Sequence, residues 1–302
     1  LTCGVKIFMG ASTGNMLVDN TATLEGIFAA TSLLVATHCE STPMILEAEA
    51  AATAKWGEDI PFSEHPNIRS VEACYASSSL AVGLARKHGT KLHVLHLTTA
   101  KELDLFDTGP IESKRITAEA CVHHLFFNSD DYAEKGALIK CNPAIKTPTD
   151  QAALLKAVIE DRIDVIATDH APHTWEEKGR KYSTAPAGLP LVQHAIISLL
   201  DRVTDGTFSI EQIVHKTAHA PAILYQVAER GFIREGYFAD LILVSPDSEH
   251  VEMPILSKCG WSPFEGHKFS HRIDKTWVNG HLRYTDGAVQ PGPFGQALTY
   301  HR

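Results

Sequence analysis

Short apolar runs recur along the first 170 residues, and each one ends at or carries an ionisable side chain. The runs at 33–37, 92–95 and 163–167 lead into His38, His96 and Asp169, and a further run at 5–9 carries Lys6. Apolar runs of this length are typical of buried strands. Because an ionisable group at the mouth of a buried strand is costly, the pattern favours a chemical role for these four side chains.

Helical apolar spacing occupies the segments between these runs. It predicts helices over 21–32, 68–88 and 149–161, with two more over 191–203 and 210–225. A further strand is predicted over 116–127. The order strand, helix, strand requires parallel pairing. Because a (β/α)8 barrel builds its active site from the carboxyl ends of parallel strands, we expect an α/β fold of the TIM type.

The texture of the chain changes near residue 231, where short strands at 239–244 and 276–284 alternate with glycine turns. We therefore expect residues 1–230 to form the C-terminal part of the barrel and residues 231–302 a small composite β domain with a C-terminal tail. About five barrel strands can be counted, whereas closure needs eight. Since the chain also starts without a methionine, the sequence predicts that the N-terminal barrel strands belong to a preceding segment of a longer polypeptide.

Composition narrows the classes of partner. A formal net charge of −9 over 302 residues argues against a nucleic-acid binder, which would show a basic face. An anionic substrate would then need a local positive site, for which metal ions are a natural source. No apolar run approaches the ~20 residues that span a bilayer, and the N-terminus lacks the layout of a signal peptide. We expect a cytoplasmic protein with a small-molecule substrate and no nucleic-acid or membrane partner, and a homodimer stays open.

The cysteines are scattered without any C-x-x-C pair, which argues against a disulfide framework and against a structural zinc site. Reduced and mostly buried thiols are expected instead. Cys39 follows His38, but neighbouring strand residues point to opposite faces, so a Cys/His nucleophile is not favoured. The six cysteines are Cys3, Cys39, Cys74, Cys121, Cys141 and Cys259.

Six ordered motifs carry a resemblance to a known family. They are VKIFM at 5–9, THCE at 37–40, HVLHLTTA at 93–100, KCNP at 140–143, TDHAPH at 168–173 and SKCGWSPFEG at 257–266. Together they resemble the dihydroorotases, a cyclic amidase branch of the amidohydrolase superfamily. The resemblance implies a zinc-dependent barrel that interconverts N-carbamoyl-L-aspartate and (S)-dihydroorotate in de novo pyrimidine biosynthesis. The family's His-x-His pair and the arginine after it have no counterpart here, so those two metal ligands and that substrate contact are expected in the preceding segment.

The resemblance implies a metal centre of two Zn2+ ions held by Lys6, His38, His96 and Asp169. Two divalent metals about 3.5–4 Å apart need a bridging anion, which a carboxylated Lys6 would supply. Inside an apolar strand, desolvation lowers the pKa of Lys6 and leaves a neutral amine able to take up carbon dioxide. The alternative is a lysine that extends its ammonium to solvent from a strand end. Each histidine taken alone could be a buried ring hydrogen-bonded to the backbone.

Asp169 is implied as the catalytic residue. A carboxylate there can take a proton as water attacks the amide carbon and return it to the leaving nitrogen. The alternative is an N-cap for the following turn. The resemblance further implies that the substrate is bound by His173, through its carboxylate, by Asn142, and by the backbone of Ala187 and Gly188. Residues 187 and 188 are equally compatible with a plain Pro/Gly turn.

Other polar residues are expected to be structural. Glu119 could form a second metal cluster with His123 and His124, but a strand would direct adjacent histidines to opposite faces, which favours hydrogen-bonded roles. Glu40 is expected to orient a ligand histidine. The remaining histidines, including His194, His215, His219 and His267, are expected to be packing or surface residues.

Two alternatives to a dihydroorotase stay open. Another cyclic amidase, a hydantoinase (dihydropyrimidinase) or an allantoinase, would share the metal ligands. A non-catalytic scaffold homologue would have lost them. Since Lys6, His38, His96 and Asp169 are all present, the scaffold is disfavoured.

Overall fold

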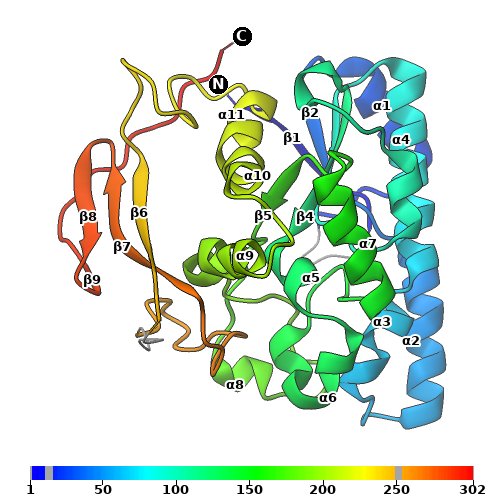
Figure 1. The fold of residues 1–302 in the computed structure, drawn as a ribbon. Coiled ribbons are helices and arrows are strands. Elements are labelled where there is room, and N and C mark those ends of the chain that lie inside the picture. The colour runs from blue at the N-terminus through cyan, green and yellow to red at the C-terminus, as the bar shows by residue number, and fades with distance from the viewer. Residues whose placement is uncertain (1, 11–15, 249–253, 302) are drawn as a thin grey trace. The chain divides into compact units, whose positions relative to one another are not determined.

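The computed structural model describes residues 2–10, 16–248 and 254–301, and it divides the chain into two compact units (Figure 1). The parallel-sheet unit comprises residues 4–192 and 257–263. The antiparallel-sheet unit comprises residues 1–3, 193–256 and 264–302. Residues 193–230 therefore fall with the antiparallel sheet, whereas the sequence analysis assigns them to the barrel. The domain boundary at residue 230 stays a prediction.

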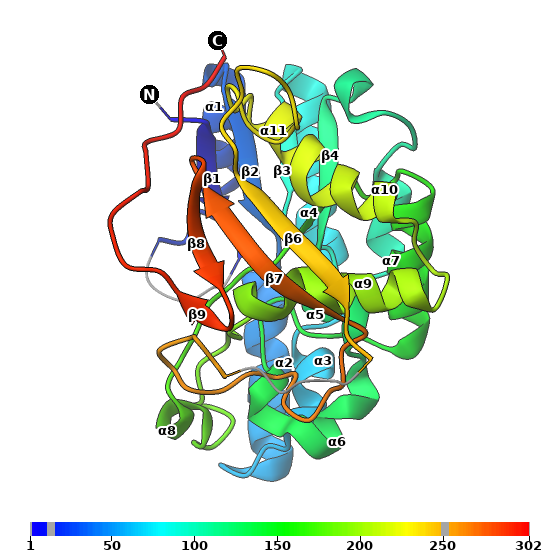
Figure 2. The same cartoon turned by 60° about the vertical axis from the view of Figure 1, so that its left-hand side comes forward.

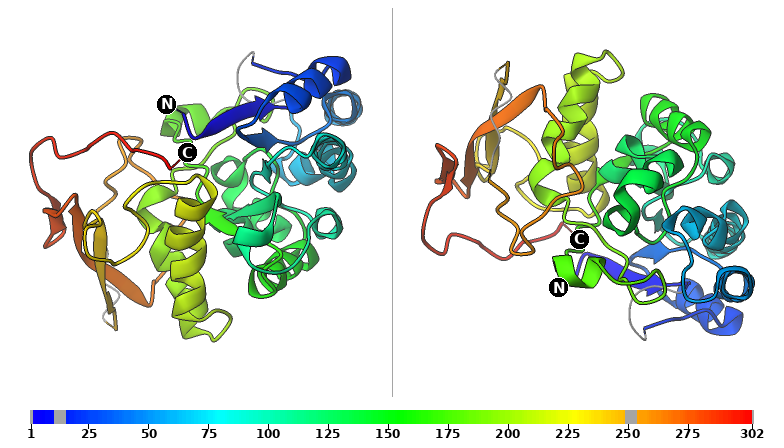
Figure 3. Two further views of the ribbon diagram at one scale, coloured as in Figure 1. Left: turned by 90° about the horizontal axis from the view of Figure 1, so that it is seen from above. Right: turned by 90° about the horizontal axis from the view of Figure 1, so that it is seen from below.

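The parallel-sheet unit is built on five strands, each hydrogen-bonded to the next one along the chain. All four pairings are parallel, as the strand-helix-strand order predicts. Seen from above and below, the blue and cyan helices lie along one side of these strands (Figure 3). The strands are β1 (Gly4–Phe8), β2 (Leu34–His38), β3 (Leu92–Val94), β4 (Ile116–Cys121) and β5 (Val165–Ala167).

Local sequence signals set the ends of the main helices. The Ser70 side chain accepts a hydrogen bond from the backbone of Ala73 where the 18-residue helix α4 begins, and Gly89 ends it in the left-handed conformation. Thr147 and Asp150 form a capping box at the start of α7. The helices are α1 (Thr21–Ala30), α2 (Thr42–Trp56), α3 (His65–Ile68), α4 (Val71–His88), α5 (Val122–Phe126), α6 (Tyr132–Lys135), α7 (Pro148–Ile159) and α8 (Trp175–Lys178), with short 3-10 turns at Phe62–Glu64, Lys101–Leu105, Ile111–Ser113, Ser129–Asp131 and Gly136–Ile139.

Two elements of the parallel-sheet unit differ from the sequence prediction. The predicted strand over 116–127 is wrong in its second half, because β4 ends at Cys121 and α5 follows at once. A short apolar run does not by itself distinguish a strand from a buried helix. Helix α2 was not predicted at all. It is rich in alanine and buries only Ile45 and Ala52 fully, so it carries little apolar periodicity.

The core of this unit consists of apolar side chains between the sheet and its helices. Val35, Leu92 and Val94 from the central strands are fully buried, as are Leu24 and Phe28 from α1. Alternation along β1 places Ile7 in this core at 3% exposure and directs its neighbour Lys6 to the other face. Apolar side chains therefore fill the core, and the ionisable side chains lie outside it, near the carboxyl ends of the strands.

The antiparallel-sheet unit contains four strands in chain order, as the glycine turns predict (Figure 2). Asn279 and Gly280 join two of them with positive φ values of 51° and 81°, which a type I′ hairpin turn requires. No helix in the described parts of the chain is long and apolar enough to cross a membrane. The elements are β6 (Leu241–Pro246), β7 (His271–Val278), β8 (His281–Thr285) and β9 (Ala288–Val289), with α9 (Ala195–Thr204), α10 (Ile210–Val214), a π-helical turn at His215–His219 and α11 (Ala220–Leu224).

Candidate active site

The carboxyl edge of the parallel sheet brings the four predicted metal ligands to one end of the strands. Lys6 lies on β1, His38 is the last residue of β2, and His96 follows β3 by two residues. Asp169 follows β5 at the same distance. Because Phe8 is in register with His38 and Thr37 with Val94, these strand ends are level with one another.

His38 and His96 lie in direct contact. The Nδ1 atom of His38 is 3.1 Å from the Nε2 atom of His96. Both rings are buried, at 2% and 4% exposure. Burial, together with the neighbouring His38 and Lys6, holds the pKa of His96 well below its usual value, so this imidazole is neutral. Neutral imidazole nitrogens are ligands that zinc prefers, at about 2.0–2.1 Å each, and two nitrogens this close can share one ion.

Glu40 fixes the His38 ring from the opposite side. Its Oε2 atom is 3.0 Å from His38 Nε2 and also accepts a very short hydrogen bond from Arg69. Burial acts to raise the pKa of Glu40, but Arg69 and His38 outweigh it and hold the pKa at about 2. A carboxylate on the outer nitrogen orients a ligand histidine, which is the role that the sequence predicts for Glu40.

Lys6 and Asp169 attract each other at this edge of the sheet, and each changes the pKa of the other. Lys6 is exposed, since the strand directs it away from the core. Partial burial of its amine nevertheless lowers the Lys6 pKa against the attraction of Asp169 and Glu119. Burial and then Glu119 raise the pKa of Asp169, and Lys6 and His38 oppose them. His96 and Asp169 both have left-handed backbones, with φ of 42° and 47°.

Glu119 belongs to this group and has the hydrogen-bonded role that the sequence analysis favours for it. Its carboxylate accepts from the His96 backbone N–H at 3.3 Å and lies 3.3 Å from His93 Nε2. It also repels Asp169. The period-two alternation of β4, which aligns Thr117, Glu119 and Cys121, is the signal that could have placed it.

His123 and His124 lie together with Cys121 instead. Because α5 begins directly after the strand, the two rings are 4.0 Å apart rather than on opposite faces, which corrects that expectation. The donor atoms of the three residues all lie within 4.8 Å of one another. Neither ring nitrogen of His123 has a hydrogen-bond partner among the described residues, whereas His124 Nε2 is 3.2 Å from the Pro143 carbonyl oxygen. A thiol and two imidazoles could hold a soft divalent ion, so this trio is a second candidate metal site.

The predicted substrate residues gather around the loop that precedes Leu189. His173 Nε2 is 3.2 Å from the Ala187 carbonyl oxygen. A Cβ on Gly188, whose φ is 139°, would lie 2.4 Å from the Ala171 carbonyl oxygen, so only glycine fits there. The Oδ1 atom of Asn142 is buried without a partner in the described structure, which leaves it available to a ligand. Trp261, from the SKCGWSPFEG motif, donates to the His173 carbonyl oxygen at 2.8 Å.

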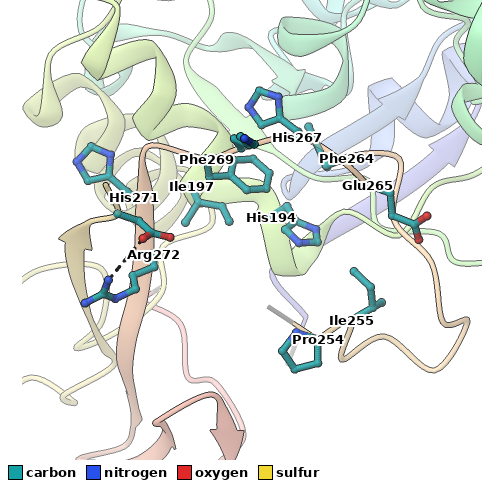
Figure 4. A pocket seen from close by; sticks show the side chains of 13 residues that line it. His194, Ile197, Pro254, Ile255, Phe264, Glu265, His267, Phe269, His271 and Arg272 are labelled. Carbon is teal, nitrogen blue, oxygen red and sulfur yellow. Dashed lines mark ion pairs between the residues drawn. The ribbon is translucent and has the colours of Figure 1, made fainter. Parts of the chain in front are cut away.

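A separate pocket of about 780 Å³ lies in the antiparallel-sheet unit, and none of the predicted site residues lines it (Figure 4). His194 stacks on Phe269 there, with ring centroids 5.3 Å apart. Arg272 pairs with Asp247 at 3.6 Å. His267 Nε2 lies 2.7 Å from Asp201. His194 therefore has a packing role, as the sequence predicts, whereas His267 pairs with Asp201.

Comparison with known proteins places this geometry in a family. Residues 20–283 match the Amidohydrolase family. A dihydroorotase from Halobacterium salinarum is 34% identical over 266 residues, covering 87% of this chain and 60% of that protein. An allantoinase from Bacillus velezensis is 29% identical over 98% of this chain and 66% of its own length. A dihydroorotase from Pyrococcus furiosus is 30% identical, over 97% of this chain and 64% of its own length. The chain thus spans about two thirds of these relatives or less.

Solved structures share the fold. An L-hydantoinase (dihydropyrimidinase) from Arthrobacter aurescens superposes with a TM-score of 0.87 at 22% identity, covering 98% of this chain and 68% of that one. A dihydroorotase from Saccharomyces cerevisiae, in complex with 5-fluoroorotic acid, has a TM-score of 0.68 at 19% identity, over 89% of this chain and 72% of that one. The predicted α/β fold of the TIM type with a flanking β domain is confirmed. The family match covers most of the chain, and the chain belongs to the amidohydrolase family.

Proposed function

We propose that this chain carries the active site of a dihydroorotase, a zinc-dependent cyclic amidohydrolase that closes N-carbamoyl-L-aspartate to (S)-dihydroorotate and reopens it. The observation that carries the proposal is the contact between His38 Nδ1 and His96 Nε2, 3.1 Å apart, at the sheet edge that also bears Lys6 and Asp169. The relatives at 30% to 34% identity that are named dihydroorotase support the choice of substrate.

The four side chains present are donors of the kind that zinc takes, and with the two further histidines expected in a preceding segment they would hold two ions. In this proposal His38, His96 and Asp169 would be ligands, and a carboxylated Lys6 would supply the anionic group between the two ions. The lowered pKa of the Lys6 amine supports the bridge, because it favours the neutral form that reacts with carbon dioxide. When bound, the ions polarise the substrate carbonyl and lower the pKa of water.

Asp169 moves the proton in the proposed reaction. In hydrolysis the ionised carboxylate takes a proton from the attacking water, the C–N bond of the ring breaks, and the proton passes to the leaving nitrogen. In ring closure the carbamoyl nitrogen forms the C–N bond with the substrate carboxylate carbon while the protonated Asp169 gives its proton to the departing oxygen. The carboxylate then carries the proton that this nitrogen loses to the same oxygen, which leaves as water. Because burial and Glu119 raise the pKa of Asp169, the protonated form that ring closure needs persists to a higher pH than in a free aspartate.

The substrate would be bound between the proposed metal ligands and the loop that carries Ala187 and Gly188. His173 is proposed to bind the substrate carboxylate, with Asn142 and the backbone of Ala187 and Gly188 as further contacts. Their grouping supports this role, since His173 contacts Ala187 and the buried Oδ1 of Asn142 lacks a partner among the described residues.

An allantoinase is the second candidate, favoured by 29% identity over 98% of this chain. Steady-state turnover of dihydroorotate, allantoin and hydantoin separates the candidates, measured on the zinc-loaded protein that includes the segment with the remaining ligands. We expect kcat/KM for dihydroorotate to exceed the other two at least a hundredfold. A preference for allantoin or hydantoin would replace the proposed substrate, and no turnover of any of the three would favour a scaffold.

Cobalt substitution tests where the metal binds. The proposed ligands offer only nitrogen and oxygen, so the Co2+ protein should lack the near-ultraviolet charge-transfer band of a thiolate ligand. Cys121→Ser should leave its spectrum unchanged, as should the control Cys259→Ser. A thiolate band that disappears only in Cys121→Ser would move the metal to the trio of Cys121, His123 and His124.

A further inference from the structure

Two lysines are buried beside the proposed substrate loop. Lys178, the last residue of α8, is 2% exposed, and Lys140, two residues before Asn142, is 8% exposed. Neither forms an ion pair with a carboxylate in the described parts of the chain. A buried ammonium without a counter-ion is costly, so its hydrogen bonds should account for its presence.

Both ammonium groups donate to main-chain carbonyl oxygens. Lys178 Nζ donates to the carbonyls of Lys140, Pro186 and Gly188 at 3.2, 3.0 and 3.0 Å. Lys140 Nζ donates to those of Tyr182 and Ala185 at 2.6 and 2.7 Å. An ammonium has three hydrogens, and Lys178 uses all of them on carbonyls.

These contacts join three segments that are distant in sequence. The α8 helix follows directly from His173, Lys140 leads into Asn142, and residues 182–188 carry Ala187 and Gly188. The Gly188 N–H closes the arrangement by donating to the Lys140 carbonyl at 2.9 Å. Each of the three segments therefore bears a residue of the proposed substrate site. The hydrogen bonds of the two lysines connect these segments.

We propose that Lys178 and Lys140 are positioning residues that hold the 185–188 loop and the Asn142 segment against His173, so that the substrate meets a pre-formed site. The substrate part of this inference rests on the proposed function. The mechanism is electrostatic as well as steric, because charge-assisted hydrogen bonds to carbonyls are about twice as strong as neutral ones.

The surroundings of the two amines act against their charge, so the positioning role rests on the geometry of the hydrogen bonds. Burial, and then repulsion by Lys140, lowers the pKa of Lys178 to about 7, with Cys141 opposing them. Burial and Arg69 lower the pKa of Lys140 to about 8, against Glu49. A neutral Lys178 amine would have two hydrogens for three carbonyls and would leave one of them without a donor. The aromatic rings of Tyr182 and Trp261 lie 4.3 and 5.9 Å from the Lys140 and Lys178 amines.

The test compares Lys178→Met and Lys140→Met, which keep most of the side-chain volume, with the control Lys181→Met. Lys181 is exposed and pairs with Glu58 and Asp59 at the surface. Hydrogen exchange is measured on the intact protein without substrate, and KM and kcat are measured with dihydroorotate. We expect Gly188 amide exchange to accelerate and KM to rise, each about tenfold, with kcat changed less than threefold. Lys178→Arg should restore part of both, and the control should match the wild type.

Three outcomes would overturn the inference. Unchanged Gly188 exchange in both methionine variants removes the positioning role, whether or not the protein turns over dihydroorotate. Faster exchange with an unchanged KM removes the link to substrate. A fall in kcat without a change in KM would assign the lysines to another step. If Lys178→Met does not fold, Lys140→Met and Lys178→Arg decide, because the first retains the Lys178 ammonium and the second retains a cation at both positions. A wild type inactive on dihydroorotate contradicts the proposed function alone, since the exchange result still decides the positioning role.

Discussion

Glu40 is the residue through which Arg69 acts on His38. We expect Glu40→Gln to lower zinc affinity 10- to 100-fold, because the amide lacks the charge that holds the ring and strengthens it as a ligand. A zinc titration against a competing chelator measures the change. Glu47→Gln, an exposed position on α2, is the matched control and should bind zinc as the wild type does. Wild-type affinity in Glu40→Gln would contradict the orienting role.

The same carboxylate makes stability depend on pH. The pKa of Glu40 is about 2 in the folded protein and about 4.5 when the group is free. Ionised Glu40 therefore stabilises the fold fully above pH 4.5, and the contribution is lost as the pH falls towards 2. Glu40→Gln should show a weaker loss of stability over this window.

Asp169 is expected to be indispensable in both directions of the reaction. Asp169→Asn should abolish hydrolysis and ring closure, since the amide can neither take nor return the proton. In the wild type, hydrolysis should fall and ring closure should rise as the pH drops through the raised pKa of Asp169. Asp161→Asn is a matched control, because Asp161 has a similar φ of 54° and is exposed at the end of α7. Ring closure by Asp169→Asn at a near-normal rate would refute the role.

At the scale of elements, the sequence predicts the strands better than it predicts the contacts between distant segments. Apolar runs that end in His38, His96 and Asp169 predict the strands β2, β3 and β5. They also predict the edge that carries the site, because an ionisable group at the end of a buried strand is costly unless it has a role. Helix α2 escaped prediction because its alanine-rich surface carries little periodicity. The grouping of Glu119 with Lys6, and of Lys178 with residues 182–188, depends on tertiary packing between distant segments, which no local pattern encodes.

The junction after β1 is the element most sensitive to added volume. A Cβ on Gly10 would lie 2.0 Å from the Glu40 carbonyl oxygen and 2.8 Å from its nitrogen. Gly10→Ala should displace Glu40, destabilise the fold by about 1–3 kcal/mol and weaken zinc binding. Gly26→Ala is the control, because α1 leaves its Cβ in open space and helix propensity should stabilise it by up to about 1 kcal/mol. Thermal unfolding and zinc titration measure both, and equal behaviour of the two variants would contradict the steric argument.

At the scale of the whole molecule, the proposed ligands all belong to the parallel-sheet unit. Since a bound ligand stabilises the part of the structure that holds it, metal removal should act unevenly. We expect a chelator to accelerate hydrogen exchange near the carboxyl ends of β1, β2 and β5 and to leave β6, β7 and β8 unchanged. Restoring zinc should reverse the effect. An equal loss of protection in both sheets would show that the metal supports the fold in another way.

The left-handed backbones of His96 and Asp169 have a consequence for how this protein can change over generations. Such a conformation costs an L-residue about 1–2 kcal/mol, and Asp169 additionally faces the like charge of Glu119. The surrounding structure thus holds two of the proposed site residues in a strained backbone conformation. Heat resistance and turnover then pull in opposite directions at these positions. A laboratory selection for thermal tolerance that ignores turnover should collect substitutions at 96 and 169 sooner than in the neighbouring strands, and activity should disappear from the survivors.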